Sequence, residues 1–263
     1  METMNKTALI TGASGGIGYE LAKLLAHDGY NLILVARNSN NLGMVGKKLA
    51  DKHKIEVICI AKDLTYIDAV DEVYDIVKEK GKQVDILVNN AGFGDRCDFI
   101  HADWARQKNM IDLNITALMR LTYLVGQDMA KQKSGKILNI SSVACVSPGP
   151  YMAVYYASKA FVTSFSQAMS EELSKYGITV TAMCPGPTAT NFEKEAHMGS
   201  SRMFKTLYVA SAEDVAKKAY RTLMKGKTLT FHGLTSKLMN ISSHFAPRFI
   251  SRKVAKKVNG TPE

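Results

Sequence analysis

Tyr155 and Lys159 lie four residues apart, and Ser142 precedes the tyrosine by thirteen residues. On a helix, side chains spaced by four residues lie one turn apart on the same face. A tyrosine hydroxyl ordinarily ionises near pH ~10, and a neighbouring cation lowers that pKa. A serine hydroxyl beside the tyrosine can polarise a carbonyl oxygen. The three residues are therefore a candidate proton-transfer site, provided that the fold brings Ser142 to the helix.

A glycine-rich turn near the start of the chain predicts a nucleotide site. Residues 6–11 have an apolar strand pattern, and a helical pattern follows the glycines at positions 12, 16 and 18. Glycine lets the backbone approach a pyrophosphate closely, and the N-terminus of the following helix favours negative charge. A glycine cluster alone is weak evidence, but one between a strand and a helix predicts nucleotide binding.

Strand-like apolar runs alternate with helical patterns along the chain, which is typical of βαβ units. Right-handed crossovers then predict an α/β fold with a doubly wound, Rossmann-type sheet of seven parallel strands, flanked by helices on both faces. Ligands of such sheets bind beyond the carboxyl ends of the strands, where Gly12, Asp63, Asn89, Ser142 and Pro185 fall. We expect strands at Thr7–Thr11, Asn31–Ala36, Glu56–Ile60, Asp85–Asn89, Lys136–Ser141, Thr179–Cys184 and Thr228–His232, and helices that include Leu113–Gln132, Ala153–Lys175 and Ala212–Lys225.

Four motifs together resemble those of the short-chain dehydrogenase/reductase family. They are Thr11-Gly12-x-x-x-Gly16-x-Gly18, Asn89-Asn90-Ala91-Gly92, Ser142 and Tyr155-x-x-x-Lys159, and the resemblance runs from about Lys6 to Thr190. The glycines at 12, 15 and 18 also fit the longer, epimerase-type branch of the family. The Asn-Asn-Ala-Gly motif and the short chain favour the single-domain oxidoreductase branch. The resemblance implies hydride transfer between a nicotinamide and a ketone or aldehyde, or from an alcohol in the reverse direction.

The resemblance also assigns catalytic roles. It makes Tyr155 the general acid in reduction and the base in oxidation, and it makes Lys159 the cation that lowers the pKa of Tyr155 and binds the nicotinamide ribose. Ser142 would hold the carbonyl oxygen. Asn114 would position a water in a proton relay, although an asparagine in an apolar helix pattern is more often a packing residue. Tyr156 is also within reach of the lysine, but it points about 100° away from Tyr155 on a helix.

The end of the second strand indicates which cofactor binds. Ala36 stands where an acidic residue would bind the ribose of NAD, and Arg37 follows it. A guanidinium can clamp a 2′-phosphate that a carboxylate would repel, so the sequence predicts that NADP(H) is preferred over NAD(H). Asp63 resembles the adenine contact of the family, although a lone acid could equally cap the next helix. The expected cofactor-binding residues are Gly12, Ser14, Gly16, Ile17, Gly18, Arg37, Asp63, Leu64, Asn90, Ala91, Gly92, Tyr155, Lys159, Pro185, Gly186, Thr188 and Thr190.

The substrate pocket is less sharply indicated. Residues 188–210 form a predicted lid over the nicotinamide, and its apolar members are Phe192, Met198, Met203, Phe204, Leu207 and Tyr208. Flexible thioethers and aromatic rings suit an adaptable apolar pocket, although packing against the next helix would explain them nearly as well. We expect the pocket to be lined by Phe93, Tyr151, Met152 and Phe192 and to take a lipophilic carbonyl compound.

The bulk composition excludes several classes of protein. The chain has 263 residues and a net charge of +10, yet no basic motif interleaved with aromatic residues indicates nucleic-acid binding. Its four cysteines are widely scattered, so we expect reduced thiols and no metal site. No apolar run approaches ~18 residues, and the first strand begins within a few residues of the start. We therefore expect a cytoplasmic enzyme with a small-molecule substrate that forms a homodimer or homotetramer, as family members commonly do.

The C-terminal region needs its own explanation. We divide the chain into a catalytic domain, residues 1–233, and a basic helical extension, residues 234–263, packed on the same domain. After Leu234 the chain has six basic residues and one acidic residue, Glu263. This difference supplies about half of the net positive charge. Alternating apolar and basic residues at 247–258 could contact an anionic membrane, or they could form a packed helix with a solvated basic face. Two other functions stay open, namely an NADP-sensing or scaffolding protein and a peripheral membrane acyl-chain reductase.

Overall fold

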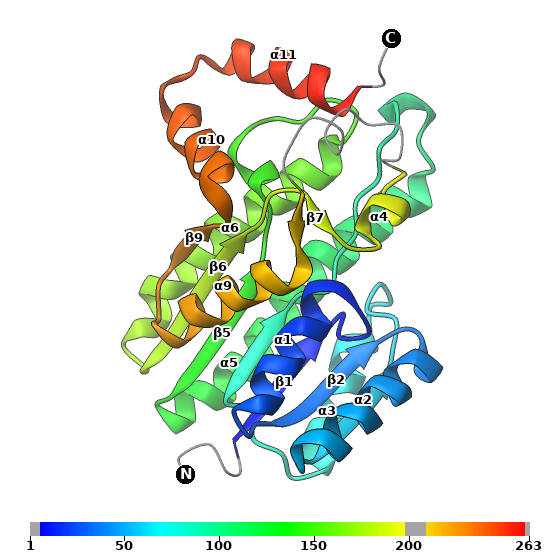
Figure 1. Ribbon diagram of the computed structural model, residues 1–263, viewed down its shortest axis with the longest axis vertical. Helices are drawn as coiled ribbons and strands as arrows, with labels where there is room; N and C mark the ends of the chain where they lie inside the picture. The colour runs from blue at the N-terminus through cyan, green and yellow to red at the C-terminus, as the bar shows by residue number, and fades with distance from the viewer. Residues whose placement is uncertain (1–5, 198–208, 261–263) are drawn as a thin grey trace.

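The computed structural model describes residues 6–197 and 209–260, which are built around one parallel β-sheet (Figure 1). The strand order is β3-β2-β1-β4-β5-β6-β9, so the predicted doubly wound, seven-stranded sheet is confirmed. The strands are β1 (Thr7–Thr11), β2 (Asn31–Ala36), β3 (Val57–Ala61), β4 (Ile86–Asn89), β5 (Gly135–Ile140), β6 (Ile178–Cys184) and β9 (Leu229–Phe231). A separate parallel pair consists of β7 (Thr188–Ala189) and β8 (Ala210–Ser211).

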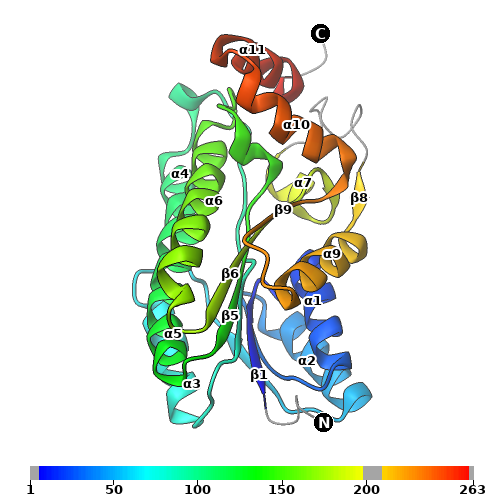
Figure 2. The ribbon, with the colours of Figure 1, turned by 90° about the vertical axis from the view of Figure 1, so that its left-hand side faces the viewer.

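Helices cover both faces of the sheet (Figure 2). One layer contains α1 (Gly16–His27), α2 (Ser39–His53) and α9 (Ala212–Met224). The other contains α3 (Ala69–Glu79), α4 (Trp104–Ile111), α5 (Leu118–Gln132) and α6 (Ala153–Ser174). Two short 3₁₀ turns, Phe99–His101 and Val143–Val146, and the short helix α7 (Phe192–Glu195) lie in the connections. The strands and the three expected helices agree with the sequence analysis except at their ends.

The helix expected at Leu113–Gln132 begins earlier and is irregular. Asp103 caps α4 by accepting a hydrogen bond from the Ala105 amide at 2.9 Å. A π-helical stretch, Asp112–Ala117, joins α4 to α5 without a break and contains Asn114. Such stretches insert one residue into the hydrogen-bond ladder and are frequent at functional sites. The insertion has no hydrophobic period of its own, which is why the pattern did not predict it.

Side chains of the central strands alternate between two hydrophobic cores, one on each face of the sheet. In β1, Ala8 and Ile10 enter the core shared with α1 and α9, whereas Leu9 enters the core shared with α3 and α5. All three are fully buried. This alternation is the period of a strand covered on both faces, and it fixes which loops emerge at the carboxyl edge.

A buried chain of amides and hydroxyls ties β4 and β5 to the helices behind them. Asn89 Nδ2 donates to Thr122 Oγ1 at 3.0 Å and to Asn139 Oδ1 at 2.9 Å. Asn139 Nδ2 in turn donates to Ser166 Oγ at 2.9 Å. Because buried polar groups are costly when unpaired, this satisfied network holds the centre of the sheet in one arrangement.

The C-terminal helices α10 (Gly233–Phe245) and α11 (Arg248–Asn259) lie beyond the carboxyl edge of the sheet, at one end of the molecule (Figures 1 and 2). Pro247 is the N-cap of α11 and separates the two helices, as its fixed φ and missing N–H predict. Among the described residues, no helix is both long and apolar enough to cross a membrane.

Candidate active site

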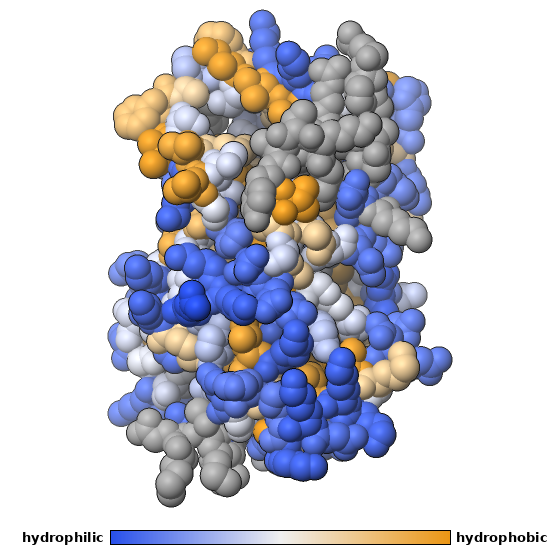
Figure 3. All heavy atoms as spheres, in the orientation of Figure 1, coloured by the Kyte–Doolittle hydropathy of each residue, from blue (hydrophilic) through white to orange (hydrophobic). Residues whose placement is uncertain are grey.

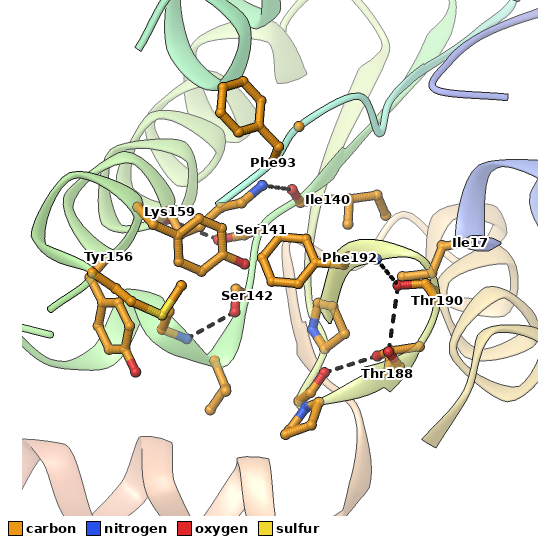
Figure 4. A pocket seen from close by; sticks show the side chains of 18 of the residues that line it. Ile17, Phe93, Ile140, Ser141, Ser142, Tyr156, Lys159, Thr188, Thr190 and Phe192 are labelled. Atoms are coloured by element: carbon orange, nitrogen blue, oxygen red, sulfur yellow. Dashed lines mark hydrogen bonds between the residues drawn. The ribbon is translucent and has the colours of Figure 1, made fainter. Parts of the chain in front are cut away.

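A cavity of about 730 Å³ lies beyond the carboxyl ends of β1 to β6 (Figure 4). Its volume is in the range of small-molecule and cofactor sites. Most of the predicted site residues line it, namely Gly12, Ser14, Gly16, Ile17, Arg37, Asp63, Leu64, Asn90, Ala91, Gly92, Phe93, Ser142, Met152, Tyr155, Lys159, Pro185, Gly186, Thr188, Thr190 and Phe192. Gly18, Asn114 and Tyr151 are not part of the lining.

The glycine loop forms a cradle that side chains would fill. Gly12 has φ +66°, and a Cβ atom there would lie 2.7 Å from Asn90 Nδ2. A Cβ atom on Gly18 would collide with the Gly12 carbonyl oxygen, so Gly18 allows α1 to pack closely against the loop. Helix α1 starts after Gly15 with no side-chain cap and no acid in its first turn. Its free N–H groups and positive dipole end therefore fit the pyrophosphate of a dinucleotide.

Arg37 and Ser14 both line the cavity, Arg37 directly after β2 and Ser14 in the glycine loop after β1. Asn41 Nδ2 donates to the Ser14 carbonyl at 2.9 Å and so ties α2 to the glycine loop. Lys62 also lines this edge and adds a second cation that the sequence analysis missed, where it forms an ion pair with Glu72. An edge with two cations fits a phosphate better than a bare ribose hydroxyl.

Asp63 does not cap the next helix, because the N-cap of α3 is Asp68; its side chain instead closes a turn, and Asp63 also lines the cavity. Its Oδ1 accepts hydrogen bonds from the Thr65 amide at 3.1 Å and from Thr65 Oγ1 at 2.9 Å. Asn90 fastens the neighbouring loop, because its Nδ2 donates to the carbonyls of Thr11 and Gly12 at 3.0 and 3.1 Å. The Asn90 side chain thus supports the glycine loop from behind.

The fold brings Ser142 to Tyr155 and Lys159. Ser142 is the second residue after β5, and Tyr155 and Lys159 lie one turn apart on α6. Lys159 Nζ donates to the Ile140 carbonyl at 2.9 Å and lies 5.8 Å from the centre of the Tyr155 ring (Figure 4). Ser141 turns the other way, and its Oγ donates to the Lys159 carbonyl at 2.9 Å. Adjacent residues in extended backbone face opposite ways, so Ser142 rather than Ser141 faces the tyrosine.

Burial controls the ionisation of this site. Burial raises the pKa of Tyr155 well above its ordinary value, and the hydroxyl of Ser142 opposes part of that rise. Burial also lowers the pKa of Lys159 to about 8. Burial is the largest influence on the phenol in this structure, and the lowering of its pKa by Lys159 stays a prediction. At neutral pH the tyrosine is protonated.

Asn114 lies behind the cavity and is almost fully buried. Its Nδ2 donates to the Phe93 carbonyl at 2.9 Å and to Ser158 Oγ at 3.1 Å, and its Oδ1 accepts from the Phe93 amide at 3.1 Å. A Cβ atom on Gly92 would lie 2.9 Å from Asn114 Oδ1 and 3.4 Å from Lys159 Nζ, so the asparagine packs beside the lysine. The π-helical stretch thus places this amide against the loop that carries Phe93.

The loop after β6 forms the opposite wall. Thr188 Oγ1 donates to the Gly186 carbonyl at 2.9 Å, and Thr190 Oγ1 accepts from the Phe192 amide at 3.2 Å (Figure 4). A Cβ atom on Gly16 would lie 3.1 Å from Thr190 Cγ2, so this wall touches the glycine loop. Of the expected lid residues, Met198, Met203, Phe204, Leu207 and Tyr208 lie outside the described residues.

The predicted substrate residues separate into two groups. Phe192 lies 5.3 Å from Tyr155 between ring centres, and Met152 and Phe93 pack in the same cluster. Tyr151, in contrast, is not in the lining, so the structure gives its assignment to the pocket no support. Its backbone has φ +65°, and its ring lies 6.0 Å from Lys256 Nζ on α11, outside the cavity.

The C-terminal helices form a roof over the cavity that the sequence analysis did not foresee. The residues that α10 and α11 contribute to the lining are Thr235, Met239, Ser242, Ser243, Ala246, Ile250, Ser251, Val254, Ala255 and Val258. This roof is apolar wherever α11 supplies it, except at Ser251. The cavity is therefore polar and cationic at the glycine loop and apolar beneath α11.

A buried hydrogen bond fastens α11 to the helix that carries Tyr155. Tyr156 Oη donates to Asn259 Oδ1 at 3.0 Å, and Asn259 Nδ2 donates to the Pro150 carbonyl at 3.0 Å. Asn259 is fully buried. The tyrosine beside the proposed acid thus holds the end of the roof rather than taking part in proton transfer.

The family model for short chain dehydrogenase matches residues 6–200. The chain belongs to the short-chain dehydrogenase family. An uncharacterized oxidoreductase of Staphylococcus saprophyticus is 34% identical over 212 residues, which cover 81% of this chain and 91% of the relative. A very-long-chain 3-oxoacyl-CoA reductase of Coprinopsis cinerea is 37% identical over 177 residues, 66% of this chain and 52% of the relative. A solved short-chain dehydrogenase of Sphingobium yanoikuyae in complex with NADPH has a TM-score of 0.82 and 30% identity, covering 91% of this chain and 93% of that one.

Family membership makes the chain an oxidoreductase that acts on carbonyl or alcohol groups.

In this short-chain dehydrogenase, Asp95 is a further residue that sequence reasoning missed. It accepts hydrogen bonds from Arg106 Nε at 2.9 Å and Gln107 Nε2 at 2.7 Å, and His197 Nδ1 lies 2.9 Å away. The cluster joins the loop after β4 to His197, which follows α7, the short helix that begins with Phe192. No short-range spacing could have revealed the contact between Asp95 and His197, which are far apart in sequence.

No group of three or more histidine, cysteine, aspartate or glutamate side chains could hold a metal ion in the part of the chain that the structure describes. The four cysteines are free thiols. Cys145 and Cys184 approach most closely, with 3.9 Å between their sulfur atoms.

Proposed function

We propose that the protein is an NADPH-dependent reductase of lipophilic ketones or aldehydes, which also runs in reverse with the alcohol. The observation that carries the proposal is the continuity of one cavity from Arg37, past Ser142 and Tyr155, to the apolar roof of α11. When bound, NADPH would supply the hydride. All other steps belong to residues of this chain.

The cofactor preference rests on charge. Arg37 and Lys62 line the edge of the cavity where β2 and β3 end, and Ala36 stands where an acid would disfavour a 2′-phosphate. The glycine loop and the start of α1 would hold the pyrophosphate. Thr188 and Thr190 would face the nicotinamide end. The NADPH complex of the Sphingobium relative agrees with this assignment.

The ionisation of the site favours reduction at neutral pH. Burial keeps the Tyr155 phenol protonated, so its Oη holds a proton that it can donate to a carbonyl oxygen. Ser142 Oγ, two residues after β5, would donate a hydrogen bond to the same oxygen. Lys159 would stabilise the tyrosinate after proton transfer and bind ribose hydroxyls. Asn114 would hold a water behind Lys159, through which the proton is replaced.

The substrate class rests on the walls near Tyr155. Phe93, Met152 and Phe192 surround the tyrosine, and Ile250, Val254 and Val258 close the cavity from α11. Such a lining favours an alkyl or ring system over a sugar or a carboxylate. The match to a 3-oxoacyl-CoA reductase supports an acyl-type carbonyl compound as one member of this class.

Steady-state oxidation of NADPH tests the proposal with a series of 2-alkanones of increasing chain length. We expect kcat/KM to rise with each added methylene, because every buried CH₂ contributes about 0.8 kcal/mol. Tyr155→Phe should reduce kcat by at least about 100-fold and leave NADPH binding intact. A protein that binds NADPH but oxidises it with no carbonyl compound would favour the scaffolding function instead.

A further inference from the structure

Helix α10 has its apolar face turned towards solvent. Leu234, Leu238, Ile241 and Phe245 follow the spacing of one helical face and are 78%, 65%, 56% and 84% exposed. The opposite face, which includes Ser243 and other small or polar residues, lines the cavity or packs on the loop after β6. A surface helix of a water-soluble domain ordinarily buries its apolar stripe, so this arrangement is the reverse of the usual one.

The apolar surface continues onto α11. Phe249, Ile250 and Val254 are 55%, 44% and 57% exposed. Figure 3 shows hydrophobic residues gathered at this end of the molecule, over α10 and the beginning of α11. Contiguous exposed apolar patches of this kind mark surfaces that bind a partner or a membrane. We call the seven exposed apolar residues, Leu234 to Val254, together with the basic residues described next, the roof surface.

Positive charge surrounds this patch. Lys237, Arg252, Lys253, Lys256 and Lys257 are exposed, and positions 233–260 contain neither aspartate nor glutamate. A second copy of the chain docked face to face would place these cations against their own equivalents, which costs free energy. An anionic lipid surface complements the roof surface in two ways. Its negative headgroups attract the basic residues, and its acyl interior accepts the apolar side chains.

We propose that the roof surface docks on an anionic lipid bilayer. The exposed side chains of α10 and Phe249 would enter the boundary between headgroups and acyl chains, and the lysines and arginines of α11 would contact the headgroups. The sequence alone indicated membrane contact only at residues 247–258, whereas the structure assigns the apolar part of the contact to α10.

Docking in this orientation would also place the mouth of the cavity against lipid. Ile250 and Val254 belong both to the exposed patch and to the cavity lining. A lipophilic substrate dissolved in the bilayer could then enter beneath α11 without crossing water. This consequence rests on the proposed function, whereas the docking itself does not.

Vesicle flotation with the full chain tests the docking. The vesicles are phosphatidylcholine alone, or phosphatidylcholine and phosphatidylglycerol in equal parts. One variant removes apolar residues, Leu238→Ser with Phe245→Ser, and another removes charge, Arg252→Gln with Lys253→Gln and Lys257→Gln. The matched control is Met44→Ser with Lys48→Gln and Lys52→Gln on α2, which is exposed at the other end of the molecule. Thermal unfolding confirms that each variant is folded.

We expect the wild type and the α2 control to float with the anionic vesicles, and salt to weaken that binding. Each roof variant should bind at least tenfold more weakly. A folded wild type that does not float overturns the proposal, as does equal flotation with phosphatidylcholine alone or an equal loss in the α2 control. Sedimentation velocity adds one further outcome. Self-association without vesicle binding, abolished in both roof variants, would show that a second copy covers this surface, which also overturns the proposal.

Discussion

At the scale of single residues, burial and charge act in opposite directions on the two central groups of the site. The Tyr155 phenol keeps its proton because it is buried, and the Lys159 ammonium loses part of its stability for the same reason. The hydrogen bond from Lys159 Nζ to the Ile140 carbonyl offsets only part of this cost. The site therefore stores an acid in its protonated form beside a cation that is expensive to bury.

The lowered pKa of Lys159 predicts a stability difference that depends on pH. The folded protein loses this proton near pH 8, whereas the unfolded chain keeps it until about pH 10.5. Because the unfolded state binds more protons in this window, the free energy of unfolding should rise with pH. Between pH 7.5 and ~10, the free energy of unfolding of the wild type should rise on the order of 3 kcal/mol more than that of Lys159→Gln. Urea titrations across this range measure the difference, and parallel curves for the two proteins would contradict the assignment.

Arg37 should decide between the two nicotinamide cofactors. Arg37→Ala removes charge-assisted hydrogen bonds to a 2′-phosphate, worth about 1.5–3 kcal/mol, so the Kd for NADPH should rise roughly 10- to 100-fold. The Kd for NADH should hardly change, because NADH lacks that phosphate. Fluorescence titration measures both constants, with Lys52→Ala on the neighbouring helix as control. An equal loss for both cofactors would remove Arg37 from the phosphate site.

At the scale of elements, the hydrogen bond between Tyr156 on α6 and Asn259 on α11, here called the latch, should keep α11 in place over the cavity. Asn259→Ala leaves the buried Tyr156 hydroxyl without its acceptor, which costs about 1–3 kcal/mol. We expect faster proteolysis within α11 and a higher KM for long-chain ketones, with the Kd for NADPH unchanged. Lys257→Ala, on the same helix but exposed, should alter none of these. A variant that loses NADPH affinity as strongly as ketone affinity would show that the latch acts on the whole site.

The sequence predicts some elements much better than others, and the reasons are physical. Buried parallel strands are short, nearly continuous apolar runs, so β1 and β2 are predicted to the residue. The π-helical stretch at Asp112–Ala117 has no distinguishing pattern. The orientation of helix α10 does not follow from its pattern, because a stripe such as Leu238, Ile241 and Phe245 ordinarily faces a core and here faces outward. Only the tertiary structure shows that its small residues roof the cavity.

Among the site residues, those within local motifs are predictable and those joined by tertiary contacts are not. The Tyr155 and Lys159 pair follows from helical spacing, and the glycine loop follows from its position between a strand and a helix. Asp95 and Asn259 act through His197 and Tyr156, which are distant from them in sequence, and Lys62 belongs to no local motif. The sequence also did not show that Tyr151 has a left-handed backbone and a ring that lies beside Lys256 of α11.

At the scale of the whole molecule, the cavity is shared by loops from every strand between β1 and β6 and by the C-terminal helices. A ligand that binds these loops together should stabilise the entire fold. At a concentration of NADPH one hundred times its Kd, the stabilisation should be about 2.7 kcal/mol. For a chain of this size the melting temperature should rise by roughly 5–10 °C. Differential scanning calorimetry measures the shift, and a rise in only part of a split transition would contradict a shared site.

The decisive experiment for the proposed reductase activity is the transfer of deuterium from NADPH labelled at C4 to a lipophilic ketone. NADPH labelled on either face of C4 is incubated with the protein and a long-chain 2-alkanone, and the alcohol is analysed by mass spectrometry. We expect deuterium at the carbinol carbon from one of the two labelled forms, and at least about 100-fold less product with Tyr155→Phe. Unlabelled alcohol from both labelled forms, or equal product from the Tyr155→Phe variant, would rule out hydride transfer assisted by Tyr155.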